Sequence, residues 1–363
     1  MEPQRVWWID CAKAYGMLLV FYAHFLKNIY FQTPYDFVFD QIKLIYSFHM
    51  PLFFLLAGTV HKPESDTGLF AKRMFRSRIV PYLFFNAIFM CGRLVEAFMA
   101  HQPINFASFS YELIQIMRGH PVYCWLLWFV VCLGSTEIIH HFNSKLVKNR
   151  HANTAVAFSI FIIGTVLSSD AVKLPFILVK ILNSYFIREA MVAYPFFYIG
   201  TLLGHLEFGK RSAAGIAFGF AVVLFMTFNT NGGPFGDVIP TVNMQTQSGQ
   251  HGNPILFPIT ALAGSMFIIG ISHLSPANRL LAVVGRSTLS LLALNTLFYQ
   301  GVNERIIRSL TAVFASGNEV SITGAALITS ALTIISCLPF IAILDRRCPT
   351  MLGKRKPIPA TAK

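Results

Sequence analysis

The sequence predicts an all-α protein that crosses a membrane many times, and three observations lead to this fold class. Hydrophobic residues make up 55% of the 363 residues, and the mean hydropathy is +0.57. Charged residues make up only 12%, which is about half of what a soluble domain carries. Apolar runs close to the roughly 20 residues that cross a bilayer recur along the chain. We therefore expect a bundle of about ten transmembrane helices.

The apolar runs place these helices along the chain. The first run lacks a small-residue cleavage site at its end, so it is interpreted as a span and not as a signal peptide. The predicted spans cover residues 7–30, 42–61, 79–100, 122–142, 153–169, 189–206, 213–229, 255–273, 284–302 and 321–344.

The basic residues predict how these spans are oriented. With the N-terminus in the cytoplasm, 19 of the 29 Lys and Arg residues lie on the cytoplasmic side and 8 on the outer side. This bias follows the positive-inside rule and favours an even number of spans with both termini in the cytoplasm. Residues 1–345 then form one transmembrane domain, and residues 346–363 form a basic cytoplasmic tail.

The same distribution excludes other classes. The net charge of +13 does not indicate nucleic acid, because the basic residues lie between apolar runs. The six cysteines show neither the spacing of a zinc site nor a disulfide framework. We expect no metal site and no permanently bound cofactor.

Two segments allow more than one interpretation. Residues 170–189 could form an extra span, but that would reverse every later loop, so an amphipathic or re-entrant segment on the outer side is favoured. The loop 230–254 is rich in Gly, Asn, Gln and Pro. It is either a flexible connector or a hydrogen-bonding cover over an outward-facing site.

The first span carries a polar stripe formed by Asp10, Lys13 and His24. At about 100° per residue, these three positions fall within a sector about 60° wide. The stripe covers about 16 Å between Lys13 and His24. It must face the bundle interior, because a charge at mid-bilayer costs several kcal/mol.

Other spans contribute polar groups at similar depth. His49 lies about as far from the outer surface as His24, so the two histidines suggest a site with a proton acceptor. The alternative is a structural role for both. Asn295 lies deep in the ninth span, and Arg286 lies at its cytoplasmic end. Trp125, near the outer interface, is either a belt aromatic or a residue that stacks on a sugar.

The loop between the second and third spans is the most basic internal segment. It carries Lys72, Arg73, Arg76 and Arg78 close to the membrane. Such a cluster either anchors the topology on anionic lipid or binds the phosphates of a cytoplasmic ligand.

Together these motifs resemble the membrane-bound acyltransferase 3 family. The resemblance rests on Asp10-x-x-Lys13 with ten residues between Lys13 and His24, on "FHMPLFFLLAG" from Phe48, and on "KRMFRSRIVPY" from Lys72. Weaker matches are "WLLWFVVCL", "FFYIGTLLG" and "GRSTLSLLALN". Many relatives carry histidine where this chain has Asn295, so hydrogen bonding is the role left open to that residue.

The resemblance implies transfer of an acyl group, commonly acetyl from acetyl-CoA, to a hydroxyl of a glycan at the bacterial inner membrane. The chain looks most like the exopolysaccharide O-acetyltransferases that decorate xanthan. The implied partners are acyl-CoA, a glycan that includes lipid-linked oligosaccharide, membrane lipid, and the polysaccharide synthesis and export machinery.

The resemblance also implies site residues. His24 is expected to act as the general base or as an acyl carrier, and His49 to bond the acceptor or orient His24. The residues expected to bind substrate are Asp10, Lys13, Lys72, Arg73, Arg76, Arg78, Arg286 and Asn295.

Two other functions remain as alternatives. A proton-coupled transporter or flippase would use Asp10, His24 and His49 as relay groups, but the chain lacks the paired repeat that is common in carriers. The second is a structural subunit of an export complex.

Overall fold

The computed structural model confirms the all-α fold. The structure describes residues 6–103, 105–168, 173, 175–204, 208–230 and 253–354. Of the described residues, 82% are helical and none lies in a strand. The helices are α1 (Trp7–Gln32), α2 (Asp36–Tyr46), α3 (His49–Thr59), α4 (Thr67–Met74), η1 (Phe75–Ile79), α5 (Val80–Met99), α6 (Phe106–Met117), η2 (Trp125–Leu127), α7 (Trp128–Leu146), α8 (Arg150–Ser168), α9 (Phe176–Asn183), η3 (Ser184–Phe186), α10 (Ile187–Leu203), α11 (Lys210–Thr227), α12 (Leu256–Leu274), α13 (Arg279–Arg286), α14 (Thr288–Leu297), η4 (Phe298–Val302), α15 (Asn303–Ser309), α16 (Thr311–Phe314) and α17 (Glu319–Arg347).

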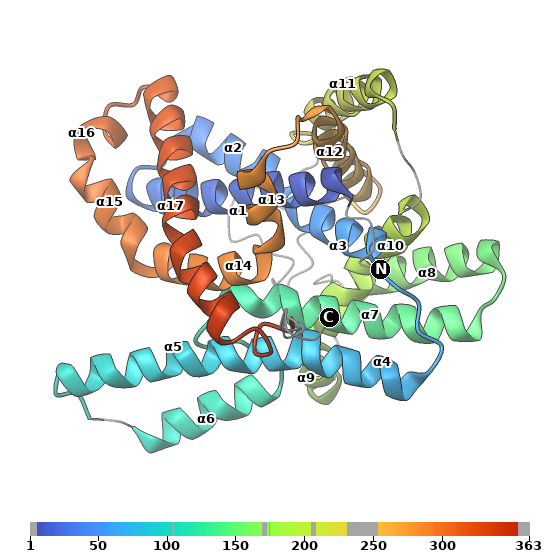
Figure 1. Cartoon of the computed structure of the whole chain (residues 1–363), viewed down its shortest axis with the longest axis horizontal. Coiled ribbons are helices and arrows are strands. Elements are labelled where there is room, and N and C mark those ends of the chain that lie inside the picture. The colour runs from blue at the N-terminus through green and yellow to red at the C-terminus, as the bar shows by residue number, and fades with distance from the viewer. Residues whose placement is uncertain are drawn as a thin grey trace, which may run out of the picture.

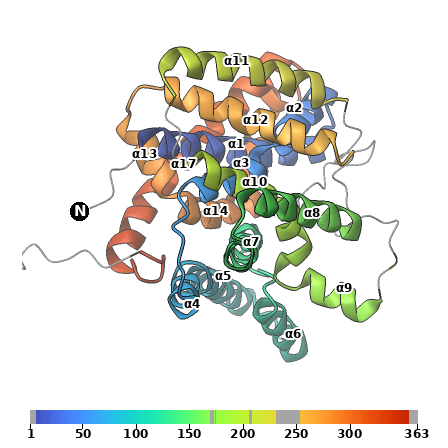
Figure 2. The same ribbon diagram turned by 90° about the vertical axis from the view of Figure 1, so that its right-hand side faces the viewer.

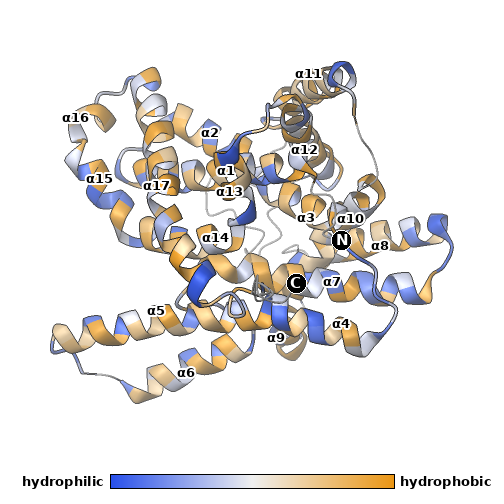
Figure 3. Ribbon diagram, viewed as in Figure 1, coloured by the Kyte–Doolittle hydropathy of each residue, from blue (hydrophilic) through white to orange (hydrophobic). Residues whose placement is uncertain are grey.

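These helices include many that are long and apolar enough to cross a membrane. Within the described ranges eight helices meet this criterion by length and composition, and nine do if α13 and the helix that follows it form one bent span. The remaining predicted span, at 189–206, corresponds to α10, which has 17 residues. Figure 3 shows apolar residues over most helices and hydrophilic ones gathered at helix ends, such as those that join α7 to α8. The protein is therefore a multi-pass membrane protein.

The helices cross one another at steep angles. In Figure 1, α5, α7 and α8 run in roughly one direction, whereas α17 crosses them steeply. Figure 2 views α5 and α7 along their axes and shows α11 and α12 side by side across them. Helix α1 lies among these layers and contacts α2, α3, α12, α13, α14 and α17. Its central position explains why Asp10, His24 and Lys27 are buried and not exposed to lipid.

Two close approaches fix the helices around α1. A Cβ atom added to Gly285 would collide with the carbonyl oxygen of Asp10, so glycine lets α13 lie directly on α1. At the crossing of α3 and α10, Cβ atoms on Gly58 and Gly200 would collide with the facing backbone. Small residues at such contacts let helix backbones pack closely.

The structure refines several predicted boundaries. The basic segment before the third span is helical, because α4 continues through the π-helical η1 into α5. The second span breaks at Ser47–Phe48, just before His49. Helix α9 has eight residues and measures about 12 Å, which is too short to cross a bilayer. Most of the predicted loop 230–254, and residues 355–363 of the tail, lie outside the described residues.

Candidate active site

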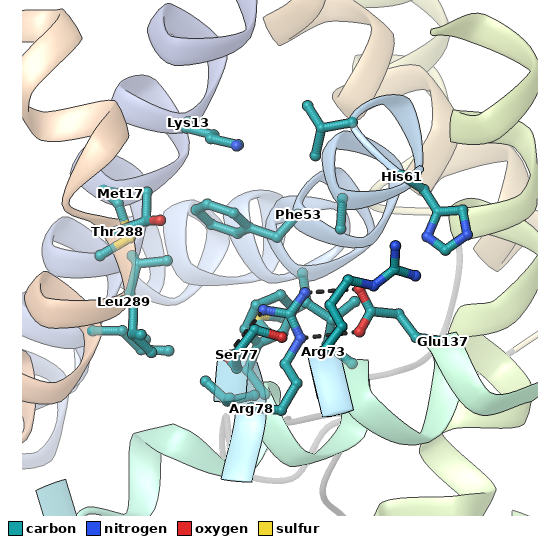
Figure 4. A pocket seen from close by; sticks show the side chains of 18 of the residues that line it. Lys13, Met17, Phe53, His61, Arg73, Ser77, Arg78, Glu137, Thr288 and Leu289 are labelled. Carbon is teal, nitrogen blue, oxygen red and sulfur yellow. Dashed lines mark hydrogen bonds and ion pairs between the residues drawn. The ribbon is translucent and has the colours of Figure 1, made fainter. Parts of the chain in front are cut away.

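A cavity of about 440 Å³ opens between α1, α3, the α4–η1 helix, α7 and α14. We call it the basic cavity (Figure 4). Its walls are formed by Lys13, Met17, Val20, Met50, Phe53, Ala57, Val60, His61, Lys62, Arg73, Ser77, Arg78, Phe129, Val130, Leu133, Glu137, Thr288, Leu289 and Leu292.

Four basic side chains and one carboxylate give the basic cavity a net positive charge. The basic residues are Lys13, Lys62, Arg73 and Arg78, and the acidic one is Glu137. Figure 4 shows Lys13 on the wall opposite Arg78. An excess of positive charge in a concave site attracts anionic ligands.

Two of the arginines are held by hydrogen bonds. Arg78 binds Glu137 through both ends of its guanidinium group, with Nη2–Oε1 at 2.7 Å and Nε–Oε2 at 3.0 Å. Arg73 donates from Nη1 to the carbonyl oxygen of Lys62 at 2.8 Å. Burial lowers the pKa of His61, which lies at the same end of the basic cavity. This end can therefore position a phosphate group between fixed donors.

The other end of the basic cavity is apolar and points along α1 toward His24. Met17, Val20 and Leu292 line this part. Val20 precedes His24 by four residues, which is one helical turn or about 6 Å. Leu292 likewise lies one turn before Asn295 on α14. The basic cavity thus ends about one turn short of a buried histidine.

His24 is enclosed by aromatic rings and bonded to one amide. Its side chain is 5% exposed, and Asn295 is 1% exposed. Asn295 Nδ2 lies 3.0 Å from His24 Nδ1. The ring centroids of Tyr299, Trp125 and Tyr46 lie 5.2, 6.0 and 6.5 Å from that of His24. This dry environment favours a neutral imidazole at rest.

The Asn295 amide determines which nitrogen of His24 can act as a base. When the amide N–H donates to Nδ1, the neutral ring carries its proton on Nε2. Rotation of the amide by 180° would let Oδ1 accept from Nδ1–H and leave the lone pair on Nε2. Oδ1 has no hydrogen-bond partner among the described residues, so this rotation breaks no bond that the structure shows. The rotated arrangement provides a base.

His49 lies in the same aromatic cluster but is held differently. Its Nδ1 is 3.0 Å from the carbonyl oxygen of Ile45, so Nδ1 donates and Nε2 is the acceptor. Its ring packs edge-on against Tyr46 at 4.7 Å, and Tyr46 also contacts His24. The structure therefore brings the two predicted histidines to the two sides of one tyrosine.

The structure places only some of the predicted basic residues in the wall of the basic cavity. Lys13, Arg73 and Arg78 line the basic cavity, whereas Lys72 and Arg76 are exposed and do not. Arg286 lies outside the lining and pairs with Asp10, with Nε–Oδ2 at 3.4 Å. This ion pair links α13 to α1 beside the contact at Gly285.

Sequence reasoning missed other cavity residues, namely His61, Ser77, Glu137 and Thr288. Glu137 offered a usable signal, because it is a carboxylate within the apolar fourth span, and such residues are rare there and usually functional. Thr288 had none. Among the described residues, no group of three His, Cys, Asp or Glu side chains could hold a metal ion.

The chain matches one known family. A family model described as an acyltransferase domain matches residues 6–343, which is nearly the whole chain. No curated protein and no solved structure matches the chain significantly. The match includes every residue of the basic cavity and of the His24 environment.

Proposed function

The chain belongs to the acyltransferase family that this domain defines, and we propose that it transfers an acetyl group from acetyl-CoA to a glycan hydroxyl, with His24 as the general base. Membership of this family supports acyl transfer to a carbohydrate-type acceptor in general. The observation that carries the finer proposal is the shape of the basic cavity, which is cationic at one end, apolar at the other, and ends one turn from His24.

The donor fits this shape by its chemistry. Coenzyme A joins several phosphates to a thin, largely neutral arm that ends in the reactive thioester. Arg73 and Arg78 would bind the phosphates, and Lys13 would lie beside the arm. Met17, Val20 and Leu292 suit the apolar part of the arm, which would bring the thioester toward His24.

In the proposed reaction, the acceptor oxygen bonds to the acyl carbon as the carbon–sulfur bond breaks. The hydroxyl proton moves to His24 Nε2 and then to the departing thiolate, so charge and atoms balance. Asn295 would hold the Nδ1–H of His24, and His49 would bond the acceptor or orient it. Arg286 and Asp10 act at a distance, because their ion pair fixes α13 against α1.

A relay is the alternative mechanism. His24 would first attack the thioester carbon and expel the CoA thiolate to form an acyl-imidazole. The acceptor hydroxyl would then attack the acyl carbon, the carbon–nitrogen bond would break, and the hydroxyl proton would pass to the released imidazole nitrogen. Incubation with labelled acetyl-CoA without acceptor separates the two. Stoichiometric labelling of histidine favours the relay, and its absence favours direct transfer.

The first experiment asks whether the purified protein uses the donor. CoA should raise the melting temperature in detergent, and labelled acetyl-CoA should pass its acetyl group to glycan or slowly to water. A transporter or a structural subunit should show neither effect. Arg73→Ala should weaken the stabilisation by CoA, whereas Arg76→Ala should not, because of these two arginines only Arg73 lines the basic cavity.

We place this activity in exopolysaccharide synthesis at the bacterial inner membrane, with a lipid-linked oligosaccharide as one form of the acceptor. This rests on the resemblance of the motifs to the xanthan-type O-acetyltransferases. NMR of the surface glycan with and without the gene tests it, since loss of O-acetyl signals is expected only if the glycan is the acceptor.

A further inference from the structure

A second cavity lies on the other side of the His24 environment. Its volume is about 250 Å³, and we call it the Glu189 cavity. It is lined by His120, Pro121, Val122, Trp125, Asn183, Phe186 and Glu189. These residues come from two segments, 118–125 and 183–189, which the distribution of basic residues predicts to lie on the side opposite the basic cluster at 72–78.

Trp125 connects the Glu189 cavity to His24. It lines the cavity, and its ring centroid lies 6.0 Å from that of His24. It also packs edge-on against Tyr299, at 5.1 Å. The basic cavity ends one turn from His24 along α1, so His24 stands between the two cavities. A reaction between two substrates that enter from opposite ends needs this arrangement.

Glu189 provides the evidence that the second cavity is built for a polar ligand. Its side chain is 5% exposed, and its Oε2 atom has no hydrogen-bond partner among the described residues. Buried polar atoms are almost always satisfied, so an unpartnered carboxylate oxygen on a residue that lines a cavity points to a ligand that donates a hydrogen bond. A carboxylate only accepts, and sugar hydroxyls are donors.

The backbone around the Glu189 cavity is held in a costly conformation. Tyr185 and Phe186 have φ values of 56° and 54°, which residues other than glycine rarely adopt. Hydrogen bonds hold Tyr185 in this conformation, since its backbone N–H donates to the carbonyl oxygen of Arg118 at 3.1 Å and its hydroxyl to that of Met117 at 2.7 Å. Such strain gathers at functional sites, and here it turns the chain just before Glu189.

We propose that the Glu189 cavity binds the carbohydrate acceptor, with Glu189 accepting a hydrogen bond from a sugar hydroxyl and Trp125 stacking on the ring beside His24. His120 and Asn183 supply further polar contacts at the half-buried rim. Aromatic rings with a few convergent polar groups are the usual lining of such sites. This inference rests on the proposed function and adds to it where the acceptor binds and which residues select it.

The test uses the full chain in native membrane vesicles that carry their own lipid-linked glycan, with labelled acetyl-CoA as the probe. Transfer to the glycan and hydrolysis of acetyl-CoA by water are measured separately. Glu189→Gln should lower glycan transfer at least tenfold and leave the KM for acetyl-CoA and the hydrolysis rate within twofold of wild type. Glu96→Gln is the matched control, because Glu96 lines a different cavity, and its glycan transfer should be unchanged.

A second variant covers the case in which Glu189→Gln does not fold. Asn183→Cys, made in a background where Cys91 and Cys348 are serine, places a thiol at the rim of the Glu189 cavity. A negatively charged methanethiosulfonate reagent should then block glycan transfer and spare hydrolysis, while the background protein is unaffected.

The outcomes separate this inference from the proposed function. If wild type labels no glycan, the proposed function fails and the inference fails with it. If wild type labels glycan and Glu189→Gln does so within twofold, the function stands and the inference is overturned. Equal loss of transfer and hydrolysis in a Glu189→Gln protein that keeps the wild-type melting temperature would also overturn it, because an acceptor site affects only the first.

Discussion

The contact between Asn295 and His24 leads to a prediction that the structure makes quantitative. Asn295→Leu removes the amide next to His24 Nδ1 and keeps the side-chain size. Both residues are buried, at 1% and 5% exposure, so no water replaces the lost bond. If His24 takes up a proton in the transition state, the bond from Nδ1–H to Asn295 supports a charged ring.

The magnitude follows from that charge. Hydrogen bonds to charged groups contribute about 1.5–3 kcal/mol. Since about 1.4 kcal/mol changes a rate tenfold, Asn295→Leu should lower kcat about 10- to 100-fold. The folded state loses less, because either orientation of the Asn295 amide leaves one polar atom at the unpartnered position that Oδ1 occupies in the structure, and leucine removes that unsatisfied atom. Activity should therefore fall while the melting temperature changes little.

The assay measures kcat for acetyl transfer together with the melting temperature. Asn303→Leu is the matched control, because Asn303 is also buried near α1 but donates to Asn28, at 3.1 Å, and not to His24. Its kcat should stay within threefold of wild type. Asn295→Asp should retain activity, since a carboxylate accepts from Nδ1–H.

Two results would refute this reasoning. One is full activity in Asn295→Leu, which would mean that His24 needs no partner at Nδ1. The other is an inactive Asn295→Asp with an unchanged melting temperature, which would mean that the amide must donate to Nδ1 and that His24 Nε2 is not the base.

Three further predictions concern stability. Arg78→Ala leaves the Glu137 carboxylate without its ion-pair partner and should lower the free energy of unfolding by about 3 kcal/mol, as measured by denaturation. An unchanged free energy of unfolding would show that this ion pair does not stabilise the fold. Gly285→Ala should lower the melting temperature, because the added Cβ meets the backbone of α1. Gly219→Ala is the control and should leave the melting temperature unchanged, because Gly219 has open space around it. Equal melting temperatures for the two variants would contradict the close packing of α13 on α1. Burial lowers the pKa of His61, so the unfolded chain takes up this proton first as the pH falls, and the free energy of unfolding should decrease below about pH 6.5. His61→Gln should reduce that decrease, and identical pH profiles would be inconsistent with it.

The sequence predicted the fold well because its signal is local. Runs of apolar residues are visible without tertiary contacts, and all ten predicted spans coincide with helices. It misjudged the segment before the third span, where Lys72, Arg73, Arg76 and Arg78 lower the hydropathy but still suit a helix. The orientation of the termini stays a prediction.

The candidate site was predictable only in part. Lys13 and His24 share one helix, so their common face follows from helical geometry. Arg286 was expected to bind substrate, and the structure places it in an ion pair with Asp10, 276 residues away; a single sequence does not reveal such a contact. The same holds for the pairing of Arg78 with Glu137.

The sequence also contained an indication that Glu189 is functional, which the site prediction did not use. It is an acidic residue at the start of an apolar span, and such residues are rare and usually functional. Its significance depends on the unpartnered oxygen and on the cavity beside Trp125, and both come from packing between distant segments.

We propose that His24 performs the transfer chemistry between the two cavities. The most direct test measures acetyl transfer to glycan and CoA binding in the same preparation of His24→Ala. We expect transfer to fall at least 100-fold, in the range of general base catalysis, and the Kd for CoA to stay within twofold of wild type. Transfer at more than about a tenth of the wild-type rate, with CoA binding intact, would contradict the assignment of His24 as the base or acyl carrier.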